Sequence, residues 1–462
     1  MAHFLSPQSA RNLPLAAALA TAMAGWLPCP AMAGTDGPVV SAEASPADKQ
    51  ADSPEQNWNL HVQNTDIVEG DLPFPAKYSG PFSLSPAGEI KETVSVDIMF
   101  GLRLWQGAEF HVDGIYWQGF GLSDARGLAG INNNEAFRVG THAGNVNFSR
   151  VFLRQTFGLG GEQEDVVDDQ LHLAGKVDVS RVTVTVGRFS AKDIFDNNAY
   201  ANDPRTQFMN WVLCANGAWD YPADSLGFMS GAVIELNQKQ WTTRYGFFQV
   251  PRVLNGEALD EHFLEAWQMV SETERRFSIY DHPGVVRFLA FLSHTHQGSF
   301  GDALEGAVRP AVTDDSGYRY KYGFGLNAEQ EVIKDVGVFA RASWNDGQTE
   351  EWQFTDADRA ASAGVSIKGS FWRRPDDVLG IAGAINGLSS NHAKYLAAGG
   401  LGIDTGDGAL TYSPERILET YYDAQIYKHV HLAFDYQFVS NPAYNRDRGP
   451  VSVFSGRLHW DF

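Results

Sequence analysis

Cysteine and positive charge are both scarce in this chain. Of its 462 residues only two are cysteine, and 35 Lys and Arg stand against 56 Asp and Glu, which gives a formal net charge of -21. This balance argues against a nucleic-acid partner, whose backbone is itself anionic. Metal sites built from several cysteines are also excluded. Cys29 and Cys214 lie on opposite sides of a predicted cleavage site, so the exported chain has no internal disulfide.

Long apolar runs are missing after the first few dozen residues, which excludes a helical membrane protein. The start of the chain has the pattern of a signal peptide: Arg11, the apolar stretch LPLAAALATAMAGWL, and small residues before Gly34. An N-terminal membrane anchor is the alternative, but the stretch is short for that role. We expect cleavage of residues 1–33. Residues 34–56 are rich in Ala, Asp, Pro, Ser and Glu, which predicts a disordered tether before a folded part at 57–462.

Alternation of apolar and polar residues dominates the remainder. The C-terminal VSVFSGRLHWDF places aromatic and aliphatic residues on one parity, and VSVDIMFGLRLW, YRYKYGFGLNAEQ, VGVFARASW, LETYYDAQIY and HVHLAFDYQFV repeat the pattern. About sixteen such segments of about 8–12 residues occur, the length with which a tilted strand crosses a bilayer. No short internal repeat indicates a propeller or solenoid. The best candidate for a helix, DEHFLEAWQMV at 260–270, should lie in a loop.

Aromatic residues decide between a membrane barrel and a soluble glycan-binding sandwich. The apolar parity repeatedly ends in Tyr, Trp or Phe, as aromatic girdles at two lipid interfaces require. We therefore predict an all-β, transmembrane antiparallel barrel of about 16 strands with inward-folded loops, located in the outer membrane of a Gram-negative cell. A barrel of this size encloses water. Its last strand should close against the first, and the terminal Phe462 should be recognised by the barrel-assembly machinery.

Several longer stretches carry a family resemblance. They are YSGPFSL, GLRLWQGAEFHVDGIYWQGFGLSDARGLAGINNNEAFRVG, GRFSAKDIFDNNAYANDPRTQFMNW and LTYSPERILETYYDAQIYKHVHLAFDYQF. With them the chain resembles the OprB family of carbohydrate-selective porins over nearly its whole folded part. The resemblance implies a sixteen-stranded barrel, passive diffusion of sugars into the periplasm, and a constriction shaped by inward loops and charged side chains. It also favours a monomer, although many porins of this strand number are trimers. GLGGEQEDVVDDQ and VLNGEALDEHFLEAWQMVSETE depart from the family pattern.

Residues 187–227 concentrate groups that bind sugar hydroxyls. The segment is too rich in Asn and Asp for a lipid-spanning strand and, at FMNWVL, too apolar for a surface tip, which predicts a loop folded into the lumen. An extracellular loop in which Asn and Asp make turns is the alternative. The candidate solute-contacting residues of this segment are Arg188, Asp193, Asp196, Asn197, Asn202, Asp203, Arg205, Trp219 and Asp220.

A second candidate set lies on the polar parity of the predicted strands. Its members are Arg103, Glu109, Asp113, Trp117, Arg244, Arg319 and Arg341. Mixed charges facing each other across a lumen orient polar solutes, whereas a merely solvated wall is the alternative. Phe152 shares a face with Arg150 and Arg154, and Val186 shares one with Arg188, so the strand parity is ambiguous in both places and a bulge is one explanation.

Other functions have weaker support in the sequence. A general or ion-selective porin is the main alternative, and a barrel enzyme acting on lipid or glycan is the second, although no nucleophile motif or acid pair is present. We expect no enzyme activity and no cofactor. His294 and His296 share a strand face without a third ligand and favour a rim position. The acidic run at 162–169 could bind divalent cations that bridge lipopolysaccharide, but a solvated loop is favoured.

Overall fold

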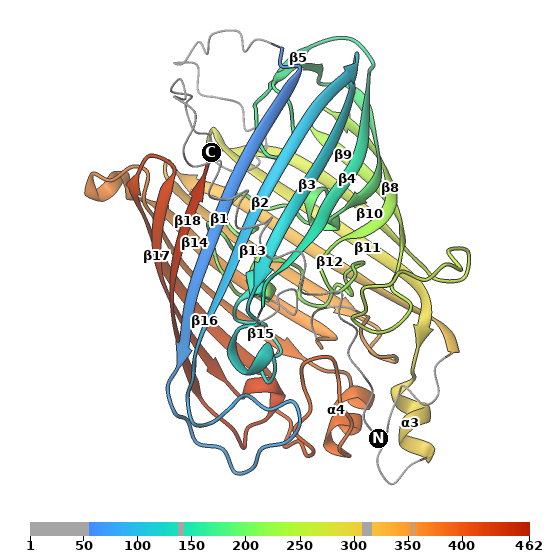
Figure 1. Ribbon diagram of the computed structural model, residues 1–462, viewed down its shortest axis with the longest axis vertical. Coiled ribbons are helices and arrows are strands. Elements are labelled where there is room, and N and C mark those ends of the chain that lie inside the picture. Colours follow the sequence, from blue (N-terminus) through green and yellow to red (C-terminus); the bar gives the residue numbers. More distant parts are fainter. Residues whose placement is uncertain (1–54, 137–142, 307–316, 353, 355) are drawn as a thin grey trace. The chain divides into compact units, whose positions relative to one another are not determined.

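A closed barrel of antiparallel strands forms the body of the computed structural model, which describes residues 55–136, 143–306, 317–352, 354 and 356–462 (Figure 1). Each strand pairs with its neighbours along the chain, and the last strand closes on the first. The sixteen barrel strands are β1 (Trp58–Asp71), β2 (Ile90–Trp105), β3 (Ala108–Gln118), β4 (Asn145–Gly158), β7 (Arg181–Phe189), β8 (Met229–Gln238), β9 (Trp241–Gln249), β10 (Trp267–Ile279), β11 (His282–Gln297), β12 (Gly317–Ile333), β13 (Val336–Asn345), β14 (Arg359–Lys368), β15 (Val378–Gly387), β16 (Glu415–Tyr427), β17 (Val430–Ser440) and β18 (Val451–Asp461). The predicted fold class is confirmed. The predicted signal peptide and residues 34–54 of the predicted tether lie outside the described residues.

The two ends of the barrel differ in how strands are connected. Five two-residue turns lie at one end, called here the short-turn end: 106–107, 239–240, 280–281, 334–335 and 428–429. Left-handed backbone at Gly107, Asp281, Asp335 and His429 makes these turns possible. The start of β1 lies at this end, and so does Phe462, whose backbone exchanges hydrogen bonds with Val62. The connections at the other end, the long-loop end, are all longer.

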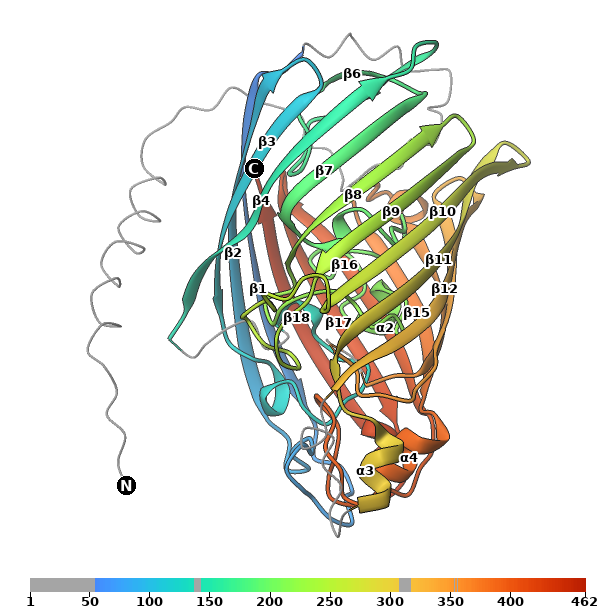
Figure 2. The same cartoon turned by 90° about the vertical axis from the view of Figure 1, so that its right-hand side faces the viewer.

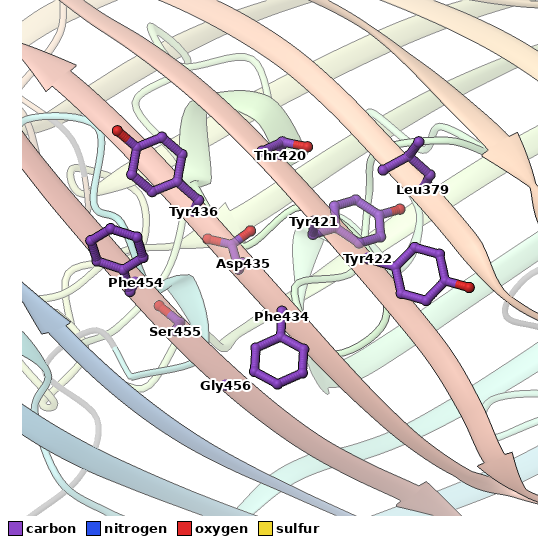
Figure 3. Close-up of a pocket in the computed structure, with 10 residues that line it drawn as sticks. All are labelled: Leu379, Thr420, Tyr421, Tyr422, Phe434, Asp435, Tyr436, Phe454, Ser455 and Gly456. Carbon is purple, nitrogen blue, oxygen red and sulfur yellow. The ribbon is translucent and has the colours of Figure 1, made fainter.

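Alternate side chains of each strand face inward and outward, as the period-two pattern predicts. In β12, Tyr320, Phe324 and Leu326 are exposed, whereas Lys321 and Asn327 are buried. In β17 and β18, Phe434 and Phe454 face outward beside Gly456 and line a shallow depression of about 470 Å³ (Figure 3). The opposite parity of the same strands is buried and mixes polar residues such as Asp435 and Arg457 with Val439 and Val453. The outer face is therefore apolar, and the inner face carries both polar and apolar side chains.

Helices are short and lie in the connections. They are α2 (Trp211–Cys214), α3 (Phe300–Gly306), α4 (Ser390–Ala397) and the 3-10 turns η1 (Leu122–Asp124), η2 (Asn134–Ala136), η3 (Ala191–Asp193), η5 (Gly369–Trp372) and η6 (Pro442–Tyr444). Among the described residues no helix has the length and apolar character needed to cross a membrane. The helix expected at 260–270 is wrong. Trp267 instead begins β10, where Gln268 and Val270 face inward and the ladder with β9 and β11 is satisfied.

The expected bulge is present in β4. The pairing register with β3 shifts between Asp113 and Gly114, and this shift brings Arg150, Phe152 and Arg154 onto the inner face. Phe152 stacks on His111 with ring centroids 4.8 Å apart. A further pair of strands, β5 (Gln163–Val166) and β6 (Gly175–Asp178), forms a separate hairpin within the β4–β7 connection at the short-turn end.

The main hydrophobic cluster lies inside the barrel. Phe195, Phe208 and Trp211, which belong to the β7–β8 connection, pack there with the inward residues Phe248 and Phe339. Figure 2 shows α2 of this connection among the surrounding strands. The interior of this barrel is therefore partly filled by one of its own loops.

Candidate functional site

Residues 190–228, the lumen segment, connect β7 to β8 and cross to distant strands. Their backbone N–H groups donate to buried carboxylates on three walls: Asp196 to Glu272 of β10 at 2.7 Å, Ala199 to Glu329 of β12 at 2.7 Å, and Met209 to Glu419 of β16 at 2.5 Å. A loop without regular structure leaves its N–H groups unpaired, so inward acidic side chains must satisfy them once the loop is buried. The wall carboxylates therefore hold the segment in place.

Asp196 is the most connected side chain of the lumen segment. It is fully buried, and its carboxylate accepts hydrogen bonds from the backbone N of Asn216 at 2.7 Å, from the side-chain amide of Asn327 at 2.6 Å and from Nε of Arg341 at 3.2 Å. Arg341 also donates to the carbonyl of Leu213 at 2.7 Å. These partners hold the pKa of Asp196 below its ordinary value, although burial opposes them. Asp196 thus fastens the segment to β12 and β13.

Two further arginines join the segment to strands on the other side. Arg150 of β4 forms a fork on Asp193 at 2.7 and 2.8 Å and reaches Asp113 of β3 at 3.2 Å. Arg205 of the segment contacts Glu135 at 3.0 Å and Asp97 of β2 at 3.3 Å. Bidentate guanidinium–carboxylate contacts fix geometry as well as charge.

Four cations of this network keep part of their surface in contact with solvent, whereas most of their partners do not. Side chains of Arg150, Lys192, Arg205 and Arg244 are 12, 13, 15 and 12% exposed. Their partners are more deeply buried: Asp113 0%, Asp196 0%, Asp97 1%, Glu272 1%, Glu274 3% and Glu135 7%. Asp193 at 11% and Glu235 at 21% are the exceptions. The four side chains, called here the cation row, therefore lie in partial contact with solvent above buried carboxylates, and the guanidinium groups of its three arginines keep N–H donors beyond these contacts.

Lys192 belongs to the lumen segment itself. Its Nζ donates to the carbonyls of Asp196 at 2.8 Å and Cys214 at 3.0 Å and to the side chain of Asn202 at 2.8 Å. Burial lowers the pKa of Lys192 to about 8, against the attraction of Asp196. Part of the charge of the cation row is therefore lost in mildly alkaline solution.

The other predicted residues of the segment mainly order the segment. Asp203 accepts from the backbone N of Arg205 at 2.9 Å, and the carbonyl of Asn197 accepts from Asn327 at 3.0 Å. Trp219 is buried edge-on against Tyr221, with ring centroids 5.1 Å apart, and Asp220 accepts from the backbone N of Trp352 at 2.7 Å. These contacts fix the conformation of the lumen segment.

The predicted strand residues fall into three places. Arg103 and Glu109 lie inward near the short-turn end, 3.9 Å apart. Trp117 lies inward and stacks on Phe228, the last residue of the lumen segment, with ring centroids 6.1 Å apart. Arg319 contacts Asp302 of α3 at 3.0 Å, at the long-loop end. Arg103, Glu109 and Arg319 thus lie away from the cation row.

Arg188 departs from its predicted inward position. It shares the parity of Val186, which is 50% exposed, and it contacts Asp224 at 2.6 Å and the carbonyl of Phe148 at 3.1 Å. The reason is that β7 continues to Phe189, whose side chain takes the inward parity. Arg188 therefore links the end of β7 to Asp224 of the lumen segment.

Several residues of the site were missed by sequence reasoning. Lys192 and Arg150 were not assigned to it, and neither were Glu272, Glu329 and Glu419, which receive the backbone of the segment. Glu272, Glu329 and Glu419 lie on the inward-facing side of their strands, and the alternation pattern of the sequence could have shown this. Their role as acceptors depends on the position of the lumen segment, which the alternation of apolar and polar residues along a strand does not indicate.

The first half of the acidic run at 162–169 is solvated, as predicted, because Glu162 and Asp165 are exposed. Glu162 pairs with Lys239 at 2.9 Å, Glu164 with Arg181 at 2.7 Å, and Asp168 with His61 at 3.2 Å. The run lies at the short-turn end, and its second half folds against the inner wall. These pairs account for Glu162, Glu164 and Asp168.

Histidine and carboxylate groups also meet near the long-loop end. Glu351, Asp356 and His392 offer ligand atoms within 4.8 Å of one another, and all three are buried. Lys321 already supplies a cation, with its Nζ 3.2 Å from Glu351, and His392 contacts Asp358 at 3.1 Å. His294 and His296, in contrast, face outward in β11 and pack against Tyr320 and Tyr318, as a rim position predicts.

A closed, even-numbered antiparallel barrel with an apolar outer face, a polar lumen and short turns at one end is the architecture of an outer-membrane channel. A family model described as "Carbohydrate-selective porin, OprB family" matches residues 83–462, and the chain belongs to this family. It is accordingly an outer-membrane porin for carbohydrates.

One solved structure supports this fold. The high-pH structure of Pseudomonas putida OprB is similar, with a TM-score of 0.67 and 17% identity over 88% of this chain and 94% of that chain. The outer membrane channel DcaP of Acinetobacter baumannii gives a TM-score of 0.49 at 8% identity, over 88% of this chain and 97% of that chain. At these identities the likeness concerns the fold alone. Among curated protein sequences none matches.

Proposed function

We propose that neutral sugars diffuse passively through this barrel and are selected at the cation row. The observation that carries this proposal is the unequal exposure of the ion pairs: Arg150, Lys192, Arg205 and Arg244 reach solvent, while most of the paired carboxylates are buried beneath them. Arginine and lysine donate hydrogen bonds but accept none. The lumen therefore offers donors to hydroxyl oxygens, and a planar guanidinium face can lie along the C–H face of a sugar ring.

Charge balance favours neutral solutes over ions. The four cations contact at least as many carboxylates, among them Asp97, Asp113, Asp196 and Glu272, so the local net charge is not positive. An anion gains little net attraction at such a site, whereas a polyol still finds donors. Weak binding of this kind also permits release, which conduction requires. This argument disfavours an anion-selective pore.

Solute swelling of proteoliposomes tests the proposal. Arg205→Gln should slow entry of glucose by up to about fivefold, the effect of about 1 kcal/mol for one charge-assisted hydrogen bond. Entry of a neutral amino acid of similar size should not slow. Arg252→Gln is the matched control, because Arg252 is 56% exposed and its contact with Glu261 spans 4.0 Å. An equal slowing of both solutes by Arg205→Gln would show that the change acts on pore size and not on sugar recognition.

A further inference from the structure

The β4–β7 connection, residues 159–180, differs from the other connections at the short-turn end because part of it enters the barrel. Asn59 of β1 is buried, and its side-chain amide donates to Asp168 at 2.8 Å and to the carbonyls of Asp169 and His172 at 3.0 Å. His61, two residues further along the same inward row, lies 3.2 Å from Asp168. One strand face thus fixes three successive parts of the connection.

Contacts with inward residues of β1, β2 and β4 show how far the β4–β7 connection extends into the barrel. The side chain of Gln170 donates to Gln63 at 2.7 Å, and Gln63 is the third inward residue of β1 from that end. On the neighbouring strands, Arg154 of β4 donates to the carbonyl of Leu171 at 2.6 Å and Arg103 of β2 to that of Ala174 at 3.2 Å. Residues 168–174 therefore lie over the inner faces of at least three strands.

The other side of this stretch is open to solvent. The side chains of Asp168, Asp169 and His172 remain 29, 25 and 38% exposed, although Leu173 beside them is buried. Since the wall covers one side, the exposed side faces the lumen. The five two-residue turns at this end are too short to enter the barrel.

We propose that residues 168–173 form a second constriction, at the short-turn exit of the lumen, where Gln170 and His172 contact the permeating sugar. The chemistry complements that of the cation row. Amide, imidazole and carboxylate groups accept hydrogen bonds from sugar hydroxyls, whereas the cation row only donates. The hydroxyl groups of a neutral sugar can accept hydrogen bonds at the cation row and then donate hydrogen bonds at the exit. The sugar contact rests on the proposed function, but the constriction itself does not.

Cysteine modification in single channels tests the constriction without any sugar. Gln170→Cys and His172→Cys should each react with a cationic methanethiosulfonate, and each reaction should lower the ion conductance in one step. Asp165→Cys is the matched control, because Asp165 is exposed on the β5–β6 hairpin and should react without a change in conductance. The parent chain controls for Cys214, which is buried. Modification of residues 170 and 172, verified by mass, with unchanged conductance would overturn the constriction, and so would failure of both thiols to react.

A second measurement keeps the sugar contact separate. Glucose at high concentration should slow the reaction at Gln170→Cys but not at Asp165→Cys. A step in conductance without protection by glucose would overturn the sugar contact at the exit. The swelling assay on Arg205→Gln reports on the cation row independently, so failure of one proposal is distinguishable from failure of the other.

Discussion

Removing the carboxylate of Asp196 should loosen the attachment of the lumen segment to β12 and β13 while the barrel stays closed. Asp196 is fully buried, and Asp196→Ala leaves Arg341, which is 3% exposed, without its acidic partner. Breaking a buried ion pair from one side costs about 3–5 kcal/mol. Arg341 keeps its contact with the Leu213 carbonyl, so we take about 3 kcal/mol, which shifts the attachment equilibrium by about two orders of magnitude.

Single-channel recording is the assay for this variant. Asp196→Ala should show larger and noisier conductance than the parent, because the segment then moves within the lumen. Its heat-modifiable mobility on a gel should persist, since backbone ladders close the barrel. Asp203→Ala is the control from the same segment, because Asp203 accepts from the nearby backbone of Arg205. Parent-like conductance and noise in Asp196→Ala would refute the assignment of Asp196 as the main attachment.

Three further predictions follow from the same geometry. The pKa of Lys192 is about 8 against an ordinary 10.5, so above pH 8 the folded chain loses a proton that the unfolded chain keeps. The contribution of Lys192 to folding stability therefore rises with pH above 8. The permeability of chloride relative to potassium should fall between pH 7 and 9 in the parent protein but not in Lys192→Met. Phe324→Lys, on the outer face at the middle of β12, should lower the free energy of unfolding in lipid by about 2–4 kcal/mol. Tyr427→Lys, near the short turns, should lower it by about 0–1 kcal/mol. Denaturant titration would measure both values, and equal losses would contradict the assignment of these residues to the lipid-facing surface. Deletion of Phe462, which is 63% exposed, should lower the amount of barrel assembled in cells without changing the conductance of refolded protein; unchanged assembly would remove the proposed role of this residue.

Strand parity was predictable because it depends only on neighbouring residues. The outward faces of β12, β16, β17 and β18 match the alternation residue by residue, and even the bulge of β4 is visible as Phe152 between two arginines. The composition of the lumen segment likewise indicated its place. What alternation could not indicate is pairing between distant parts, such as the contact of Asp196 with Arg341.

The same limit explains the individual errors. Arg188 was expected inward, but the strand extends one residue beyond it and gives the inward position to Phe189. The acidic run at 162–169 is solvated in its first half, as predicted, but the contact of Asp168 with His61 of β1 joins two distant parts of the chain and was not predicted. Charge alone in a sequence does not report whether a partner exists across the barrel.

Swelling of proteoliposomes that contain the parent protein tests the central claim most directly. Glucose should enter faster than a neutral amino acid of similar size, because a polyol offers several hydroxyl oxygens to the donors of the cation row and carries no charged groups to be repelled there. Equal entry of the two solutes, scaled by size alone, would contradict selection by Arg150, Lys192, Arg205 and Arg244.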